Sequence, residues 1–203
     1  MDRSFPLLCI SRHRMGIDGT GVTTLVCGAG CPLHCRFCIN RRLLAEEPPK
    51  MVTADELYEM VVVDDLYFRA TGGGITFGGG ESLLQADFFH GFRQKCGNGW
   101  HLCAETSLSV PREFVSVAAD TIDEFIVDCK DMDPAIYHSY TGGSQKRMEE
   151  NLCFLLEKAG PDRVVVRVPL IPDYNTDDDR QKSLSRLKEL GVTKLDVFEY
   201  VRC

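Results

Sequence analysis

The sequence predicts an α/β fold in which a mainly parallel sheet curves into a short, open barrel. Strand-like segments alternate with amphipathic helical segments along most of the 203 residues. That order favours parallel strands joined by right-handed crossovers. An eight-stranded barrel typically needs about 250 residues, so a smaller open barrel or a strongly curved sheet fits this length better. We expect one domain over residues 1–203.

Six apolar or β-branched segments are the expected strands. Residues 1–16 precede them and are predicted to form an entry strand or arm. The six strands are expected at residues 22–26, 75–77, 101–104, 124–127, 164–168 and 195–198. Chemistry in such sheets lies outside the carboxyl ends of the strands, so the loops after the first four strands are the informative ones.

The helices are marked by capping residues and breakers. Thr53 and Glu56 have the spacing of a capping box, which starts the first helix, and the glycines at 72–74 break the chain after it. Further amphipathic helices are expected at residues 82–96, 111–119, 145–159 and 177–191.

Composition excludes several classes of protein. The net charge is −7 and no block of Lys and Arg stands out, which argues against non-specific binding of nucleic acid. No run of about 18 apolar residues and no signal peptide is evident. We therefore expect a cytoplasmic protein without membrane partners, and a monomer.

Ten cysteines are unusual in a chain of this length, but a disulfide framework fits poorly. Such frameworks stabilise small domains that lack a core, whereas this chain has enough apolar segments for one. Three of the cysteines also crowd into eight residues. The other seven are expected to be reduced, mostly buried thiols that behave as small hydrophobic groups. They are Cys9, Cys27, Cys96, Cys103, Cys129, Cys153 and Cys203.

The crowded cysteines, Cys31, Cys35 and Cys38, directly follow the first parallel strand. Three thiolates leave a tetrahedral zinc site unfinished, and His34 or a distant cysteine would have to complete it. His34 is more often a solvated loop residue than a ligand. An iron–sulfur cluster held by three cysteines would leave one iron open to an exogenous ligand. On the residues alone, both zinc and iron remain possible.

Three further motifs follow predicted strands or lie in them. Gly78-Gly79-Gly80-Glu81 offers a backbone that a ligand can approach closely, although a glycine triplet is often just a turn. Asp128 and Lys130 come directly after a strand, where a solvated ion pair is the simpler interpretation. Arg167 lies in an apolar strand and needs an anionic partner there, which favours a ligand-facing role.

The spacing Cys31-x3-Cys35-x-Phe37-Cys38 resembles the signature of the radical S-adenosylmethionine (SAM) superfamily. Over roughly residues 14–200 the chain is similar to the pyruvate formate-lyase activating enzymes, which activate glycyl radical enzymes. The motifs that carry this similarity are Gly19, Gly21, residues 31–40, residues 72–86, residues 128–130 and Arg167.

The resemblance implies a partial (β/α)6 TIM-like barrel and a [4Fe-4S] cluster on Cys31, Cys35 and Cys38. The open iron would chelate the amino and carboxylate groups of SAM. A flavodoxin- or ferredoxin-type reductant would supply the electron that cleaves SAM. The substrate would be a glycine of a partner glycyl radical enzyme, which makes the protein an oxidoreductase of anaerobic metabolism.

The resemblance also implies two sets of binding residues. The SAM set is Phe37, Asn40, Gly79, Gly80, Glu81, Lys130 and Arg167. In it, Phe37 would pack beside the adenine, the Gly79–Glu81 turn would bind the methionyl ammonium, Lys130 the carboxylate, and Arg167 the ribose or methionine. The second set would hold a monovalent cation, and it comprises Glu105, Thr106, the Ile126 carbonyl and Asp128. The family usually has aspartate where this chain has Glu105.

Two features depart from the family. Glu199-Tyr200-Val201 stands where relatives have Pro-Tyr-His, and residues 40–72 contain no cysteine, so we expect no ferredoxin-like insert and one cluster. Alternatives are another small radical SAM enzyme that acts on a nucleotide or peptide, or a non-catalytic zinc or electron-transfer protein. Which glycyl radical enzyme is the partner does not follow from one sequence.

Overall fold

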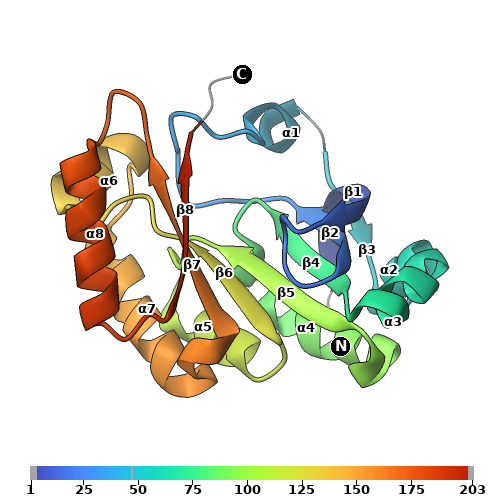
Figure 1. The fold of residues 1–203 in the computed structure, drawn as a ribbon. Coiled ribbons are helices and arrows are strands. Elements are labelled where there is room, and N and C mark those ends of the chain that lie inside the picture. Colours follow the sequence, from blue (N-terminus) through green and yellow to red (C-terminus); the bar gives the residue numbers. More distant parts are fainter. Residues whose placement is uncertain (1–3, 47, 201–203) are drawn as a thin grey trace.

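The computed structural model describes residues 4–46 and 48–200. Its strands form a single sheet in the order β3-β1-β2-β4-β5-β6-β7-β8 (Figure 1). The strands are β1 Phe5–Met15, β2 Val22–Gly28, β3 Lys50–Val52, β4 Gly74–Gly79, β5 His101–Thr106, β6 Glu124–Asp128, β7 Val164–Leu170 and β8 Lys194–Glu199. Val201 and Cys203, which enter the sequence predictions, lie outside the described residues.

Six of these strands, β2 and β4 to β8, run parallel to their neighbours. They are the six predicted strands, each extended by one to three residues. The predicted entry strand is β1, which pairs antiparallel with both β2 and β3. The expected α/β fold with a mainly parallel sheet is therefore confirmed.

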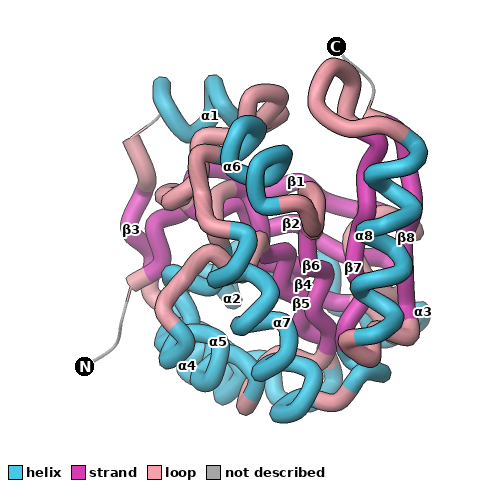
Figure 2. Tube along the Cα trace, turned by 90° about the vertical axis from the view of Figure 1, so that its left-hand side faces the viewer, coloured by secondary structure: helices cyan, strands magenta, loops and turns pink. Residues whose placement is uncertain are grey.

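Helices connect the strands and cover the outer face of the curved sheet (Figures 1 and 2). They are α1 Arg41–Glu46, α2 Ala54–Val61, α3 Asp65–Thr71, α4 Ala86–Cys96, α5 Arg112–Ala119, α6 Pro134–Thr141, α7 Gln145–Ala159 and α8 Asp177–Glu189. The capping box predicted at Thr53 and Glu56 is present at the start of α2. The first predicted helix, which was expected to run to the glycines at 72–74, is divided into α2 and α3 by a 3-10 turn at Val62–Asp64. The short elements α1, β3 and α6 were not predicted.

The core lies between the sheet and these helices. Phe77 of β4 is fully buried, and its ring centroid is 4.6 Å from that of Phe89 and 5.6 Å from that of Phe92 on α4. The apolar spacing on α4 places these rings on one helix face. Helix α7 contributes two further buried side chains to this core, Leu152 and Leu155. This packing fixes the outer wall of the barrel and leaves its inner face for polar side chains.

The turn between β1 and β2 folds into the amino end of the barrel. The Thr76 hydroxyl donates to the carbonyl of Asp18, and the Thr20 hydroxyl lies 3.4 Å from Glu124 Oε2. Gly19 adopts φ +106°, and an added Cβ would lie 3.3 Å from that of Cys103, so this turn needs a glycine. The turn therefore lies against β4, β5 and β6 at this end of the barrel.

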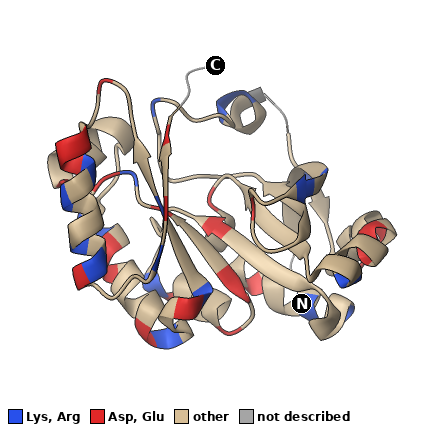
Figure 3. Cartoon of the chain, viewed as in Figure 1, with Lys and Arg blue, Asp and Glu red and all other residues tan. Residues whose placement is uncertain are grey.

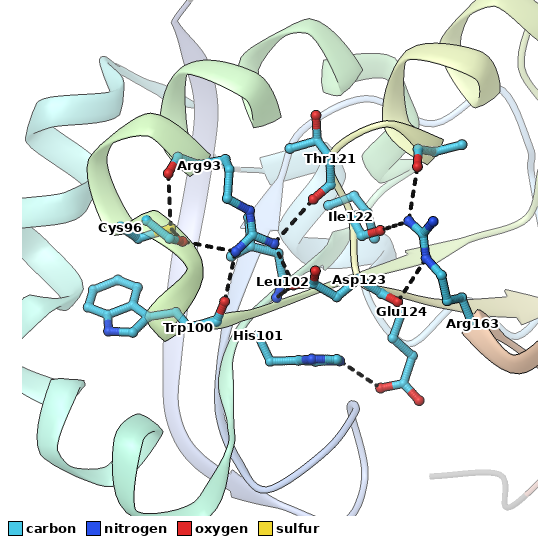
Figure 4. A network of polar contacts seen from close by, with 12 residues as sticks. Arg93, Cys96, Trp100, His101, Leu102, Thr121, Ile122, Asp123, Glu124 and Arg163 are labelled. Atoms are coloured by element: carbon cyan, nitrogen blue, oxygen red, sulfur yellow. Dashed lines mark hydrogen bonds and ion pairs between the residues drawn. The ribbon is translucent and has the colours of Figure 1, made fainter.

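Arginines organise the amino edge, where the parallel strands begin (Figure 4). The Arg93 guanidinium donates to the carbonyls of Gly97 (3.0 Å), Trp100 (2.8 Å) and Thr121 (3.1 Å), and it pairs with Asp123. Asp123 Oδ2 in turn accepts from the backbone N–H of Leu102 at 2.8 Å.

Arg163 fixes the same edge from the side of β7. Its guanidinium donates to the carbonyls of Ala119 (2.9 Å), Ile122 and Asp123 (3.2 Å). Within the described residues, no helix is both long enough and apolar enough to cross a membrane.

Candidate functional site

The predicted cysteine cluster lies in the loop that follows β2, at the carboxyl edge of the sheet. We call residues 31–38 the cysteine loop. Cys31, Cys35 and Cys38 are each partly exposed, and all three are free thiols. Cys38 is also tied to its own loop, because its N–H donates to the Cys35 carbonyl at 3.3 Å. The loop thus presents three unoxidised sulfur donors at the edge where α/β sheets bind ligands.

Backbone hydrogen bonds hold this loop on both sides. On one side, the N–H of Gly80 donates to the Gly28 carbonyl (3.0 Å), and that of Glu81 to the Gly30 carbonyl (2.8 Å). An added Cβ on Gly80 would lie 2.1 Å from the Gly30 oxygen, so only glycine permits this approach. The Gly-rich motif and the chain entering the cysteine loop are therefore one packed unit.

On the other side, the end of α6 holds the cysteine loop. The N–H of His34 donates to the Thr141 carbonyl (2.8 Å), and that of Arg36 to the Tyr140 carbonyl (3.0 Å). The Arg41 guanidinium donates to the Cys35 carbonyl at 2.9 Å. His34 is thereby fixed through its backbone while its side chain stays exposed.

The pKa values of the loop thiols reflect partial burial. Burial raises the pKa of Cys31 to about 11 and also raises that of Cys35. The charges of Glu81 and of the other two loop cysteines act on Cys31 in the same direction. Metal binding by these residues would therefore release protons.

The carboxylate of Glu81, which was predicted as a SAM ligand, accepts hydrogen bonds from other residues of the protein. Glu81 is 2 % exposed and accepts hydrogen bonds from the Thr106 hydroxyl (2.6 Å), from the N–H (2.9 Å) and hydroxyl (2.6 Å) of Ser107, and from the N–H of Leu83 (3.2 Å). Burial still raises the pKa of its carboxyl group. Its side chain orders the loop after β5.

Asn40 connects the two motifs. Its side-chain amide donates to the Gly79 carbonyl at 2.8 Å, which ties the residue after the cysteine loop to the Gly-rich turn. Gly79 has φ +92°, and an added Cβ would lie 2.9 Å from the Cα of Cys27. The structure therefore brings together Asn40, Gly79, Gly80 and the three cysteines.

Lys130 lies on the same edge and pairs with Asp128, with 2.9 Å between Nζ and Oδ2. Lys130 is only 9 % exposed. Burial alone would lower the pKa of Lys130. The nearby Asp128 carboxylate and the Cys35 sulfur have a larger effect in the opposite direction, so the pKa of Lys130 is raised. Lys130 is therefore a buried, charged lysine beside the cysteine loop, and its role toward a ligand stays a prediction.

Arg167 points into the barrel and finds its anionic partners within the chain. Its guanidinium is 2.7 Å from Glu105 Oε1, 3.6 Å from Asp196 and 3.9 Å from Asp18. Burial raises the pKa of the Glu105 carboxyl although Arg167 opposes that shift. The anion that the sequence required for Arg167 is therefore Glu105 in this structure.

The four predicted cation ligands do not form one ligand set here. Glu105 pairs with Arg167, the Thr106 hydroxyl donates to Glu81, and Asp128 pairs with Lys130. Ile126 is a central residue of β6, between β5 and β7. Among the residues that the structure describes, no three His, Cys, Asp or Glu side chains converge on a position for one metal ion.

An aromatic cluster that the sequence reasoning missed packs against the cysteine loop. The Phe37 ring lies 5.7 Å from that of Tyr174, 6.0 Å from that of Tyr140 and 6.3 Å from that of Tyr200. The Tyr200 hydroxyl donates to the Phe37 carbonyl at 3.1 Å. Tyr200 thus packs the end of the described chain against the cysteine loop. The signal available in the sequence was a tyrosine in each of the segments that follow β6, β7 and β8.

Two buried tyrosine hydroxyls near the cysteine loop make no well-formed hydrogen bond among the described residues, although Ser109 lies near the first and Tyr200 near the second. They belong to Tyr137 and Tyr140 of α6, both at most 1 % exposed. Beside this cluster is an open depression of about 400 Å³. It is lined by Leu170, Pro172, Asn175, Thr176, Asp177, Glu199 and Tyr200.

The donor set suits an iron–sulfur cluster. Three free thiols on one short loop are the ligands such clusters take. Each cysteine would bind a different iron, so convergence on a single ion is not required. Lys130, the Gly-rich backbone and the aromatic cluster all lie beside the loop.

Comparisons with known proteins agree with this site. Residues 25–194 match the family described as the Radical SAM superfamily. The structure of Streptococcus suis SuiB bound to S-adenosylmethionine superposes with a TM-score of 0.65 at 14% identity, over 85% of this chain and 39% of that one. The chain therefore belongs to the radical SAM superfamily, and its fold is the partial TIM-like barrel of these enzymes. Membership implies a [4Fe-4S] cluster and SAM.

Within that superfamily the chain is similar to enzymes that activate glycyl radical enzymes. It is 30% identical over 189 residues to Pyruvate formate-lyase 1-activating enzyme of Escherichia coli (strain K12), which covers 91% of this chain and 76% of the relative. It is 34% identical over 158 residues to (2S)-3-sulfopropanediol dehydratase activating enzyme of Klebsiella oxytoca, covering 75% of this chain and 49% of that relative. The resemblance stated from the motifs is confirmed.

Proposed function

We propose that this protein is an activase that reductively cleaves SAM and removes a hydrogen atom from a glycine of a partner glycyl radical enzyme. The observation that carries the proposal is the cysteine loop, with three free thiols packed against the Gly-rich turn. The similarity to activating enzymes over most of the chain supports it.

Cys31, Cys35 and Cys38 would hold the cluster. When bound, the cluster supplies the electron that cleaves SAM to methionine and 5'-deoxyadenosine. The protein's part is to bind and orient SAM. We assign the methionyl ammonium to the backbone of the Gly79–Glu81 turn, because the Glu81 carboxylate already accepts hydrogen bonds from Thr106 and Ser107.

Lys130 and Arg167 are assigned to the anionic and polar parts of SAM, and Phe37 and Asn40 to the nucleoside side. Both cations are paired with carboxylates in this structure, Lys130 with Asp128 and Arg167 with Glu105. If a monovalent cation took Asp128 and Glu105 as ligands, together with Thr106 and the Ile126 carbonyl, both basic side chains would be released toward SAM. Cation binding would then strengthen SAM binding.

The exposed side of the cysteine loop suits an acidic electron donor of the flavodoxin or ferredoxin type. Ile39 is 83% exposed, and Arg36 and Arg41 are exposed beside it, in a chain with net charge −7. Figure 3 shows the basic segment on α1, whereas both signs intermix on α7 and α8. Complementary charge accelerates such encounters and makes them salt-sensitive. Arg36→Glu should slow reduction by an acidic flavodoxin but leave reduction by dithionite unchanged.

The central test is anaerobic reconstitution with iron and sulfide. We expect about four irons per chain and dithionite-dependent formation of 5'-deoxyadenosine. Cys35→Ala should lose both, whereas the exposed Cys153→Ala should keep both. If Cys35→Ala kept cluster and cleavage, the assignment would be wrong. If Cys35→Ala loses both, a second experiment distinguishes the two kinds of radical SAM enzyme. A glycyl radical detected by electron paramagnetic resonance on a candidate partner indicates an activase, whereas turnover of a nucleotide or peptide indicates the alternative.

A further inference from the structure

Two cysteines outside the cysteine loop face each other across the β1–β2 hairpin. Cys9 of β1 is paired directly with Cys27 of β2 in the antiparallel register. Residues directly opposite in such a ladder have Cα atoms about 4.5–5.5 Å apart. That separation lies within the range of about 4.4–6.8 Å found in disulfides. None of the other strand pairings in the described part of the chain opposes two cysteines.

The two side chains also lie close together. Cys27 is 3 % exposed, Cys9 is half-buried, and neither is oxidised in this structure. Burial raises the pKa of the Cys27 thiol, and hydrogen bonding with the Cys9 thiol raises it further. The direct register pairing and this interaction together place the two thiols next to each other.

The strand geometry around Cys9 permits that movement. The β1–β2 register shifts between Leu7 and Cys9, which marks a bulge directly beside the pair. A bulge interrupts the ladder locally and re-aims the side chains next to it. Cys9 can therefore approach Cys27 without disturbing the regular pairing of Ile10 with Val26 that follows.

The position of Cys27 couples the pair to the candidate site. Cys27 comes four residues before Cys31 on the same strand and loop. Its Cα and Cβ would both lie 2.9 Å from a Cβ added to Gly79, so it packs tightly against the Gly-rich turn. A covalent bond at Cys27 would tie β1 to the segment that delivers the cysteine loop.

We propose that Cys9 and Cys27 form a reversible disulfide that responds to small-molecule disulfides such as oxidised glutathione. Cys9, the more accessible thiol, attacks the oxidant as a thiolate and releases one glutathione. Cys27 then attacks the Cys9 sulfur of the mixed disulfide and releases the second. The pair loses two electrons and two protons, and oxidised glutathione becomes two molecules of reduced glutathione. This chemistry needs neither the cluster nor SAM and goes beyond the activase function.

The test uses reconstituted protein under anaerobic conditions, equilibrated with graded mixtures of reduced and oxidised glutathione. Free thiols are alkylated, the protein is digested, and the peptides are identified by mass spectrometry without reduction. We expect a linked peptide that joins Cys9 to Cys27, which disappears when excess reduced glutathione is restored. Cys9→Ser should abolish the link and leave Cys27 free, whereas Cys153→Ser should leave the link intact.

Cys153 also serves as an internal reference. It is exposed on α7 and none of the strand pairings opposes it, so it should form only a mixed disulfide with glutathione. The proposal is overturned if Cys27 stays a free thiol in wild-type protein across mixtures that modify Cys153, or if Cys9 is linked to a cysteine of the cysteine loop instead. Both outcomes are read in the wild-type chain, so a poorly folded variant does not affect them.

Discussion

The two edges of the barrel satisfy their polar groups in different ways. At the amino edge, Arg93 and Arg163 donate to carbonyls and to Asp123, and the chain supplies every partner drawn in Figure 4. At the carboxyl edge, the thiols are free, and the hydroxyls of Tyr137 and Tyr140 make no well-formed hydrogen bond among the described residues. The amino edge is completed by the protein itself. The carboxyl edge also pairs Glu81, Lys130 and Arg167 within the chain, but it keeps its three loop thiols free.

Energetics follow the same division. A hydrogen bond from a charged group contributes about 1.5–3 kcal/mol, whereas a buried polar group without a partner costs about 1–3 kcal/mol. The arginine network at the amino edge should therefore stabilise the fold, whereas the buried tyrosine hydroxyls at the carboxyl edge should cost some stability. In barrels of this type, residues at the amino face serve stability and those at the carboxyl face serve chemistry.

The largest expected effect comes from Gly80→Ala at the carboxyl edge. The new Cβ would meet the Gly30 carbonyl at 2.1 Å, and neither backbone segment can yield without moving the cysteine loop. We expect bound iron to fall by more than half and SAM cleavage by more than about 100-fold, beyond the 10- to 100-fold typical of changes around metal ligands. Iron analysis and product assay measure both.

Gly91→Ala is the matched control for that substitution. Gly91 lies in α4, and its added Cβ would make an ordinary 3.9 Å contact with Ala54. Alanine is also the better helix former, by up to about 1 kcal/mol. The control should keep iron and cleavage. Normal iron content in Gly80→Ala would mean that the Gly-rich turn does not shape the cysteine loop.

Next in size is Arg93→Ala at the amino edge. It removes three bonds to carbonyls and the pair with Asp123, in a side chain that is 15% exposed. We expect the free energy of unfolding to fall by about 2–4 kcal/mol, and the unfolding temperature by roughly 5–15 °C. SAM cleavage per folded molecule should not change. Chemical denaturation and a cleavage assay at low temperature separate the two quantities.

Lys146→Ala is the control at an exposed ion pair. Its Nζ lies 3.8 Å from Glu150 and its side chain is 84% exposed, so the loss should stay below about 0.5 kcal/mol. The distinction between the edges would break down if Arg93→Ala lost cleavage while keeping its stability.

How far the sequence predicted this division depends on whether a feature is local. The Thr53–Glu56 capping box, the apolar strands and the spacing of the three cysteines are local patterns, and each is found where it was expected. The start of α6 also had a local signal that went unused, because Asp133 caps the helix and Pro134 is its first residue.

The sequence could not predict which side chains pair with each other when the strand register alone brings them together. Arg167 was predicted to face a ligand, but Glu105, 62 residues earlier, pairs with it over the intervening strand β6. In the same way, Glu81 meets Thr106 and Ser107 from the next strand. A single sequence gives neither the register nor the curvature that brings these side chains together. The ligand roles of these residues therefore stay predictions.

A smaller effect concerns Glu124 at the amino edge. A hydrogen bond with His101 is the main cause that holds the pKa of Glu124 below its usual value of 4.5. Its stabilisation is therefore present above pH 4.5 and is lost as the pH falls through the lowered pKa. Glu124→Gln should lower stability at pH 7 by at most about 1 kcal/mol, and the difference from wild type should shrink in acid. Denaturation between pH 3 and pH 7 tests this, and a difference that grows in acid would contradict it.

The smallest expected effect, Tyr140→Phe, tests whether the carboxyl edge is incomplete by itself. The Tyr140 hydroxyl is buried and makes no well-formed hydrogen bond, although Tyr200 lies near it. Its removal should therefore leave the cluster-free protein unchanged or stabilise it by up to about 1 kcal/mol. With cluster and SAM bound, the same change should become destabilising if the hydroxyl meets a ligand.

Thr24→Val is the control. It removes a buried hydroxyl that does have a partner, Asp64 at 2.8 Å, and should cost about 1–3 kcal/mol in both states. Equal losses for the two variants in the cluster-free protein would show that Tyr140 is satisfied without a ligand.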